Sequence, residues 1–181
     1  SEMCIRDSNE AATIAEVVRA SMAAVGEGTE VIVVDDGSTD RTKDLAIANE
    51  ATVVPVVKRH IAAVRNAGAH TATGDYLFFV DADTEINSSL LQASVKTLSS
   101  GAVGGGCRFR FDRPIPWYGH FAERIVAPLY SLAGLAGGCF LFCTRAAFES
   151  AGGFDESRFA SEEVWLSLAL RKRGRFVIVP E

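Results

Sequence analysis

The chain has 181 residues, of which 48% are hydrophobic and 23% are charged, and its formal net charge is −5 at pH 7. This length and composition suit one soluble globular domain with a sizeable buried core. The basic residues cluster once, over 171–175, where a helix carboxyl terminus accounts for them. The charge pattern therefore argues against a nucleic-acid partner.

The cysteines indicate a reducing compartment. Cys4, Cys107, Cys139 and Cys143 form no Cys-x-x-Cys pair, and three of them lie in or beside apolar runs. This pattern predicts buried thiols rather than disulfides or a zinc site. The N-terminus also lacks the apolar segment of a signal peptide. We therefore expect a cytoplasmic protein.

An uncharged stretch over 125–143 approaches the length of a membrane span. Pro128 and several glycines interrupt it, and it divides into a helix and a strand at residues 137–138, so we do not expect it to cross a membrane. Trp117, Tyr118 and Phe121 precede it and suit either a core or a helix resting on a membrane surface. Peripheral contact at the inner face of the membrane stays an open alternative.

Helices and strands alternate along the whole chain, which predicts an α/β fold with a mostly parallel sheet covered on both faces. In chain order we expect a helix over 9–22, a strand over 31–34, a helix ending near 49, a strand over 52–57, a helix over 60–73, a strand over 76–80, a helix from 87 or 88, a strand over 102–111, a helix over 117–135, a strand over 139–143, a helix over 144–150, a helix from 161 to about 173 and a strand over 176–179.

Local signals fix some of these elements. Pro55 lacks a backbone donor, so its strand is expected at an edge of the sheet. Gly74 is expected to cap the helix before it. Ser161 is expected to cap the last helix, whose first turn carries two glutamates.

The first eight residues do not suit a central strand, since they offer only Cys4 and Ile5 among polar residues. We therefore expect the sheet to lack its first strand. On this interpretation residues 1–8 are foreign to the domain, which occupies 9–181 and is truncated at both ends.

Two acidic side chains follow the most apolar strand. Residues 76–80 are typical of a strand buried on both faces, and Asp81 and Asp83 come directly after them. Side chains at i and i+2 project from the same side of an extended backbone. Their oxygen ligands suit Mg²⁺ or Mn²⁺, which would also hold the phosphates of a substrate. The alternative is that these acids only open a turn.

A second acidic pair, Asp35-Asp36, ends the strand over 31–34 and leads into Gly37. Asp carboxylates accept hydrogen bonds from a base or a ribose, and glycine permits a tight turn. A capped strand-to-helix turn is the simpler interpretation, but it does not explain two adjacent acids.

Further segments complete a pattern that holds in order and spacing from residue 8 to 181. They are Asn9-Glu10, VVDDGSTD over 33–40, AVRNAG over 63–68, GDYLFFVDAD over 74–83, GGCF over 137–140, GGFDE over 152–156 and Glu162-Glu163 in a helix that ends at Gly174. This series resembles family 2 glycosyltransferases of the GT-A fold, a Rossmann-like three-layer α/β/α architecture. Each motif alone is weak, whereas the series is specific.

The resemblance implies a donor site for a nucleotide-diphosphate sugar, most simply a UDP-sugar. Asp36 would accept from the base, with Asp35 and Gly37 supporting the turn. Asp83 would be the main ligand of Mn²⁺ or Mg²⁺, with Asp81 toward the ribose or the metal.

The resemblance assigns further residues of the pocket. Asn9 and Glu10 would border the nucleotide, and Gly137 and Gly138 would let the backbone approach the donor sugar or acceptor. Arg65 would lie near the nucleotide or phosphates, although a helix-surface arginine in a salt bridge is an equal alternative.

The resemblance also implies a catalytic base. Glu163 matches the second acid of the family's Glu-Asp pair and would deprotonate an acceptor hydroxyl, giving inversion at the anomeric carbon. Glutamate stands here where aspartate is commoner, so whether Glu162 or Glu163 points into the site stays open. Both acids could instead only stabilise a helix N-terminus.

The sequence thus predicts a metal-dependent inverting glycosyltransferase with an unidentified acceptor, either lipid-linked or a saccharide. One alternative is an inactive nucleotide-binding fragment without its first strand. Another is a sugar nucleotidyltransferase, which would need a Gly-rich, basic phosphate loop near that strand.

Overall fold

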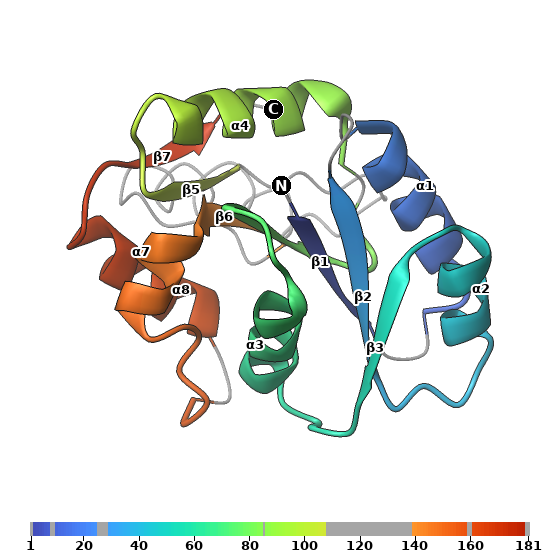
Figure 1. Cartoon of the computed structure of the whole chain (residues 1–181). Helices are drawn as coiled ribbons and strands as arrows, with labels where there is room; N and C mark the ends of the chain where they lie inside the picture. The colour runs from blue at the N-terminus through green and yellow to red at the C-terminus, as the bar shows by residue number, and fades with distance from the viewer. Residues whose placement is uncertain are drawn as a thin grey trace, which may run out of the picture.

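A seven-stranded sheet forms the centre of the molecule (Figure 1). The computed structural model describes residues 2–7, 10–24, 29–84, 86–107, 139–158 and 161–179. Within them the strands are β1 (Glu2–Asp7), β2 (Glu30–Asp36), β3 (Thr52–Val56), β4 (Tyr76–Asp81), β5 (Gly104–Cys107), β6 (Phe140–Thr144) and β7 (Phe176–Val179). Their order is β3-β2-β1-β4-β6-β5-β7, and only β6 runs antiparallel to its neighbours.

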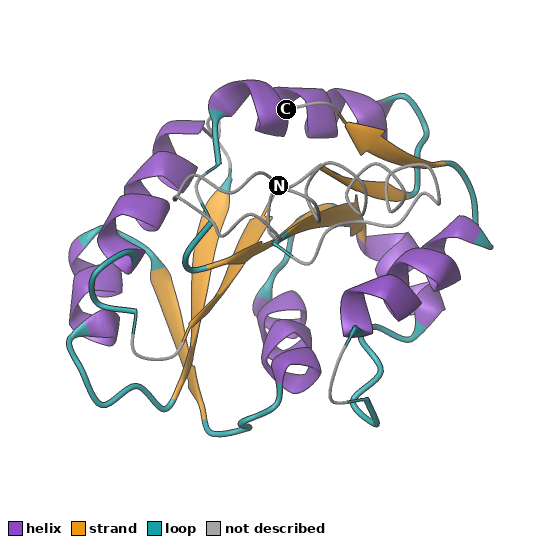
Figure 2. Cartoon of the chain, turned by 180° about the vertical axis from the view of Figure 1, so that it is seen from behind, coloured by secondary structure: helices purple, strands orange, loops and turns teal. Residues whose placement is uncertain are grey.

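Helices cover both faces of this sheet, which confirms the expected three-layer α/β/α fold (Figures 1 and 2). The described helices are α1 (Ile14–Ala24), α2 (Thr42–Ala48), α3 (Ile61–Thr71), α4 (Ser88–Ser99), α7 (Arg145–Ala151) and α8 (Glu162–Arg171). α1, α2 and α4 share one face, and α3, α7 and α8 share the other. Within the described ranges, no helix has the length and apolar character needed to cross a membrane.

Successive side chains of β4 point alternately into the two cores, which lie on opposite faces of the sheet. Phe78 and Val80 lie in the core under α1 and α4, whereas Leu77 and Phe79 lie in the core under α3, α7 and α8. All four are at most 1% exposed. A strand buried on both faces has no polar position along its length, which explains the unbroken apolar run in the sequence.

The first strand is present, so the expectation that it is missing was wrong. β1 pairs in parallel with β2 on one side and with β4 on the other, at the centre of the sheet. Met3, Cys4 and Ile5 are each at most 2% exposed. The sequence interpretation overlooked Met3, and three consecutive apolar side chains suffice because they sit mid-strand, with polar residues only at its ends.

Other element predictions had mixed outcomes. β3 is an edge strand, as Pro55 predicted, and Asn87 caps α4 by accepting from the Leu90 N–H. The first helix begins at Ile14 rather than residue 9, and Ala72 rather than Gly74 follows the end of α3. The helix expected over 117–135 lies outside the described residues.

The glycines of β5 are required by the close packing of its neighbours, in addition to making the strand less regular. Gly104–Cys107 lies between β6 and β7. A Cβ on Gly105 would stand 2.1 Å from the Val177 carbonyl oxygen and 2.4 Å from Cζ of Phe142. The Phe142 ring therefore occupies the space that a side chain on β5 would need.

Gly105→Ala is expected to lower the free energy of unfolding by about 1–3 kcal/mol, because the new methyl group collides with backbone and a buried ring. Urea denaturation measures this loss. In Gly152→Ala a Cβ meets nothing within 4 Å, so that variant reports only the cost of a left-handed backbone at φ +84°. An unchanged stability of Gly105→Ala would contradict the crowding seen here.

Candidate active site

The acidic motifs lie together at one edge of the sheet, where parallel strands end. Asp35 and Asp36 end β2, and Asp81 ends β4 with Asp83 in the following turn. β1 lies between these strands, and its residue Arg6 pairs with Val34 on one side and Asp81 on the other. Strand spacing then separates the two acidic motifs by roughly 10 Å. Ligands of open α/β sheets bind at such a carboxyl edge.

The carboxylates of the first acidic pair hold the loops around them. Asp35 is buried and accepts from the Ser38 N–H at 3.0 Å, which supports the turn as expected. Oδ1 of Asp36 accepts from the backbone N–H groups of Lys58 at 2.7 Å and Arg59 at 3.1 Å. Asp36 therefore fixes the connection between β3 and α3, and its Oδ2 has no hydrogen-bond partner among the described residues.

A buried arginine joins the second acidic motif to the last helix. Arg65, on α3, is 5% exposed. Its Nη2 donates to Oδ1 of Asp81 at 2.9 Å, and its Nη1 donates to Oε1 of Glu162 at 2.9 Å. Arg65 thus makes the salt bridges of the second alternative, but it is buried and does not lie on the helix surface. It brings the carboxyl end of β4 and the first turn of α8 into one cluster.

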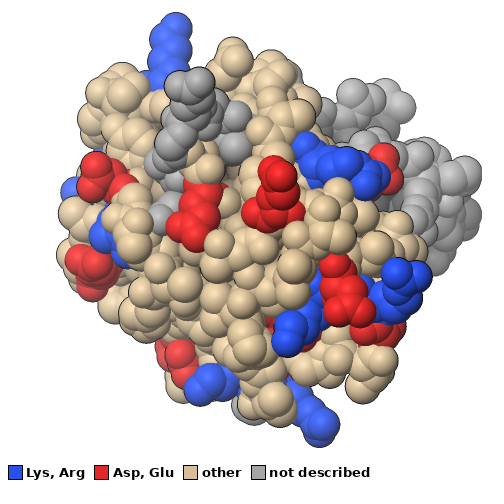
Figure 3. All heavy atoms as spheres, turned by 45° about the vertical axis from the view of Figure 1, so that its right-hand side comes forward, with Lys and Arg blue, Asp and Glu red and all other residues tan. Residues whose placement is uncertain are grey.

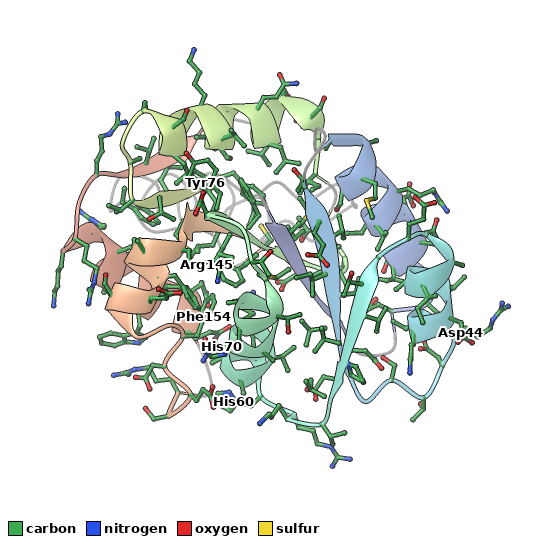
Figure 4. All side chains as sticks on the ribbon, in the orientation of Figure 1. Asp44, His60, His70, Tyr76, Arg145 and Phe154 are labelled. Carbon is green, nitrogen blue, oxygen red and sulfur yellow. The ribbon has the colours of Figure 1, made fainter. Side chains whose placement is uncertain are left out.

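Asn66, the residue after Arg65 on α3, also holds a segment that is distant in sequence. The Asn66 side chain accepts from the Phe154 N–H and donates to the Phe154 carbonyl oxygen, each at 2.9 Å. It also donates to Oε1 of Glu156 at 2.9 Å. Figure 4 shows Phe154 between α3 and the α7–α8 pair. Asn66 therefore holds the segment that leads to α8, a role that the sequence interpretation missed.

Asn66→Asp tests this clamp, because a carboxylate cannot donate to the Phe154 carbonyl oxygen and would repel Glu156. The loss of buried hydrogen bonds is expected to lower the free energy of unfolding by about 1–3 kcal/mol in chemical denaturation. Asn87→Asp is the control, because the exposed Asn87 side chain only accepts, from the Leu90 N–H and the Ser89 hydroxyl, and a carboxylate keeps both contacts; this variant should change the free energy of unfolding by about 0.5 kcal/mol or less. Equal losses would argue against a special role for Asn66.

The two glutamates of α8 have different surroundings. Glu162 is 4% exposed and paired with Arg65. Glu163 is half-buried, and burial raises the pKa of its carboxyl group, with the negative charge of Glu162 adding to the effect. Glu163 has no ion-pair partner among the residues that the structure describes, and an unpaired carboxylate with a raised pKa has the properties of a general base, whereas Glu162 has those of an anchor.

Two thiols border the second acidic motif. The Cys139 carbonyl oxygen accepts from the Asp81 N–H at 3.3 Å. The Cys139 thiol hydrogen-bonds the Cys107 thiol, which lowers its pKa against the opposing effect of burial. All four cysteines are free thiols, and Cys4, Cys107 and Cys143 are buried as predicted, whereas Cys139 is only half-buried.

The remaining predicted residues are only partly described. Asn9, Gly137 and Gly138 lie outside the described residues. Glu10 precedes α1, and the neighbouring Ala11 N–H donates to Oδ2 of Asp40 at 3.2 Å. This hydrogen bond brings the Glu10 segment next to the loop that follows β2.

The acids can supply only part of a metal's coordination shell. Among the described residues no group of three or more His, Cys, Asp or Glu side chains could hold a metal ion. Asp81 and Asp83 would thus leave most positions to phosphates and water, which is how Mg²⁺ is commonly held beside a phosphorylated substrate. The donor set therefore fits a hard divalent cation brought in with its substrate.

Comparison with known proteins shows the family. A family model described as glycosyl transferase family 2 matches residues 8–149. The chain belongs to this family. The glycosyltransferase class expected from the sequence is confirmed at the level of the family.

Relatives and solved structures agree with this assignment. Putative glycosyltransferases of Mycobacterium tuberculosis are 34% identical over 116 residues, covering 59% of this chain and 33% of the relative. The putative glycosyltransferase EpsH of Bacillus subtilis is 30% identical over 76 residues, covering 39% of this chain and 22% of EpsH. The chain thus spans a third or less of the curated relatives it matches.

The structural neighbours are GT-A glycosyltransferases, which confirms the expected fold. Glucosyl-3-phosphoglycerate synthase of M. tuberculosis, solved with Mn²⁺ and UDP, has a TM-score of 0.79 at 21% identity over 99% of this chain and 68% of the synthase. Mannosyltransferase PcManGT of Pyrobaculum calidifontis, solved with GDP-Man and Mn²⁺, has a TM-score of 0.77 at 22% identity over 99% of this chain and 54% of the transferase.

Proposed function

We propose that this family 2 chain is the donor-binding and catalytic part of a metal-dependent inverting glycosyltransferase that moves a sugar from a nucleotide-diphosphate donor to an acceptor hydroxyl. The observation that carries the proposal is the Arg65 cluster. It joins the acid that ends β4 to the helix that bears two glutamates, at the edge of the sheet where ligands bind.

The donor end of the site uses the acids that follow β4 and β2. Asp83, which is exposed, and Asp81, whose charge is partly balanced by Arg65, would hold Mn²⁺ or Mg²⁺. The cation would stabilise the charge of the departing nucleoside diphosphate. The structural neighbours solved with Mn²⁺ support this assignment.

Asp36 is the proposed acceptor for the nucleotide base, through the carboxylate oxygen that its backbone contacts leave unused. Asp35 and Gly37 would hold the turn, the latter at φ +73°. Glu10 would border the pocket. Asn9, Gly137 and Gly138 keep the roles that the family resemblance gives them. A UDP-sugar remains the favoured donor, and the neighbours bind both UDP and GDP-Man.

Glu163 is the proposed base. Its half-buried carboxyl group has a raised pKa and lies on the same helical turn as the anchored Glu162. Glu163 would take the proton of the acceptor hydroxyl as that oxygen attacks the anomeric carbon, and the opposite face would release the diphosphate. One displacement of this kind inverts the configuration. The acceptor is proposed to be a saccharide or a lipid-linked group.

The two alternatives have less support. The inactive-fragment interpretation depended on a missing first strand, and β1 is present between β2 and β4. A sugar nucleotidyltransferase would need a basic Gly-rich loop after the first strand, yet residues 8–13 read Ser-Asn-Glu-Ala-Ala-Thr. Peripheral contact with the inner membrane face and a cytoplasmic location remain proposals.

Calorimetric titration with UDP and GDP, with and without Mn²⁺, tests the donor site. We expect one nucleotide to bind in the presence of Mn²⁺ and the Asp83→Ala variant to lose at least tenfold in affinity, since a metal ligand is removed. Asp75→Ala is the matched control, because Asp75 is exposed next to the opposite end of β4. Metal-independent binding, or equal effects of both substitutions, would contradict the proposed metal site.

The pH dependence of turnover tests the base. Because burial raises the pKa of Glu163 above its ordinary value of 4.5, the rate should fall as pH is lowered through a midpoint above 4.5. Glu163→Gln should lower kcat by about 10²–10⁴-fold. Glu149→Gln, an exposed position on α7, should leave kcat unchanged. Full activity of Glu163→Gln would eliminate Glu163 as the base.

A further inference from the structure

Arg65 connects three elements that are distant in sequence. It lies on α3, and its two carboxylate partners lie 16 residues away on β4 and 97 residues away on α8. Both distances are 2.9 Å, and the guanidinium carbon also lies 5.4 Å from the centre of the Phe154 ring. One buried side chain therefore bridges all three elements.

The shape of the guanidinium group matters for this connection. Its two terminal nitrogens donate in fixed directions from one plane, so a single arginine can hold two carboxylates at a defined separation. A lysine ammonium is a point donor at the end of a flexible chain and cannot reproduce this geometry. The pair of contacts thus requires arginine rather than positive charge alone.

The start of α8 has little else to hold it among the described residues. Ser161, at the N-cap position, has a left-handed backbone and makes no side-chain cap hydrogen bond, contrary to the expected capping role. A second contact follows one turn later, where Arg158 stacks on the half-exposed Trp165 ring at 3.8 Å. The Glu162–Arg65 pair is the buried anchor of the first turn, which also carries Glu163.

We infer that Arg65 is a positioning residue that holds the base-bearing turn of α8 in register with the proposed metal-binding end of β4. This inference rests on the proposed function. Arg65 contacts the carboxylates of Asp81 and Glu162, which lie on the two elements that it holds together. Loss of this bridge removes neither carboxylate from the chain, but it lets the first turn of α8, with Glu163, shift relative to the donor sugar. A misplacement of about 1 Å costs on the order of a hundredfold in rate.

The test compares Arg65→Lys, Glu162→Gln and the double variant in Mn²⁺-dependent turnover of UDP-glucose and GDP-mannose, with water as the acceptor. Each single variant is expected to lower kcat by about a hundredfold, with the KM for the donor within about threefold. The double variant should be no slower than the slower single variant, because both substitutions cut the same bridge. Glu162→Gln keeps the side-chain shape and remains measurable if Arg65→Lys unfolds too readily.

Arg145→Lys is the matched control. The Arg145 guanidinium is also partly buried on the same side of the sheet, but it donates to the carbonyl oxygens of Gly74 and Ala69 (Figure 4). A similar fall in kcat for Arg145→Lys would show that lost stability explains the effect. A raised KM with unchanged kcat in Arg65→Lys, or multiplied losses in the double variant, would also overturn the inference.

The same assay separates this inference from the proposed function. Wild-type protein that neither binds nor turns over either donor with Mn²⁺ would overturn both, since a positioning role requires a reaction. An active wild type together with an Arg65→Lys variant of unchanged kcat would overturn the positioning role alone.

Discussion

The ion pairs of Arg65 with Asp81 and Glu162 are the constraint on which the site depends. A carboxylate as buried as Glu162 would cost several kcal/mol if it lacked a partner, so its place in the fold requires the arginine. The reverse also holds, because a guanidinium that is 5% exposed needs acceptors. The sheet edge and α8 are therefore fixed relative to each other by charge, while the apolar layers above and below fix only the general arrangement of the elements.

Neighbouring residues of α3 hold different segments on this face of the sheet. Arg65 faces the acids, and Asn66 clamps the backbone of Phe154 in the segment that leads to α8. Gly68, two positions further, lies so close to β1 and β2 that a Cβ would stand 2.9 Å from the Val34 side chain. This close approach brings α3 down onto the strands, which lets Arg65 reach Asp81. Figure 3 shows one face of the molecule, on which acidic and basic side chains of the described residues lie among each other.

Much of the fold could be predicted because its signals are local. The apolar run before Asp81, the Pro55 edge strand and the asparagine cap at Asn87 each depend on neighbours within a few residues. The acidic motifs could be placed at one sheet edge for the same reason, since parallel strands end there. The Arg65–Glu162 pair could not be predicted, because it spans 97 residues and depends on how α3 and α8 dock. The first strand was missed because its three apolar residues are too few to stand out until both neighbouring strands are in place.

Stability alone does not explain why Arg65, Asp81 and Glu162 are all charged. A buried ion pair can often be replaced by apolar side chains at no cost to stability, so retention of three charged groups needs another reason. Asp81 borders the proposed metal site, and Glu162 adjoins the proposed base. Without a positive charge between them, the two carboxylates would repel each other and the phosphates of a donor. One arginine between them offsets part of this charge, but Asp83 and Glu163 have no salt bridge in the described part of the chain. The remaining negative charge would favour a divalent cation beside Asp83 and a proton on Glu163, which are the two charges that the proposed metal-assisted transfer with a carboxylate base would bring to the site.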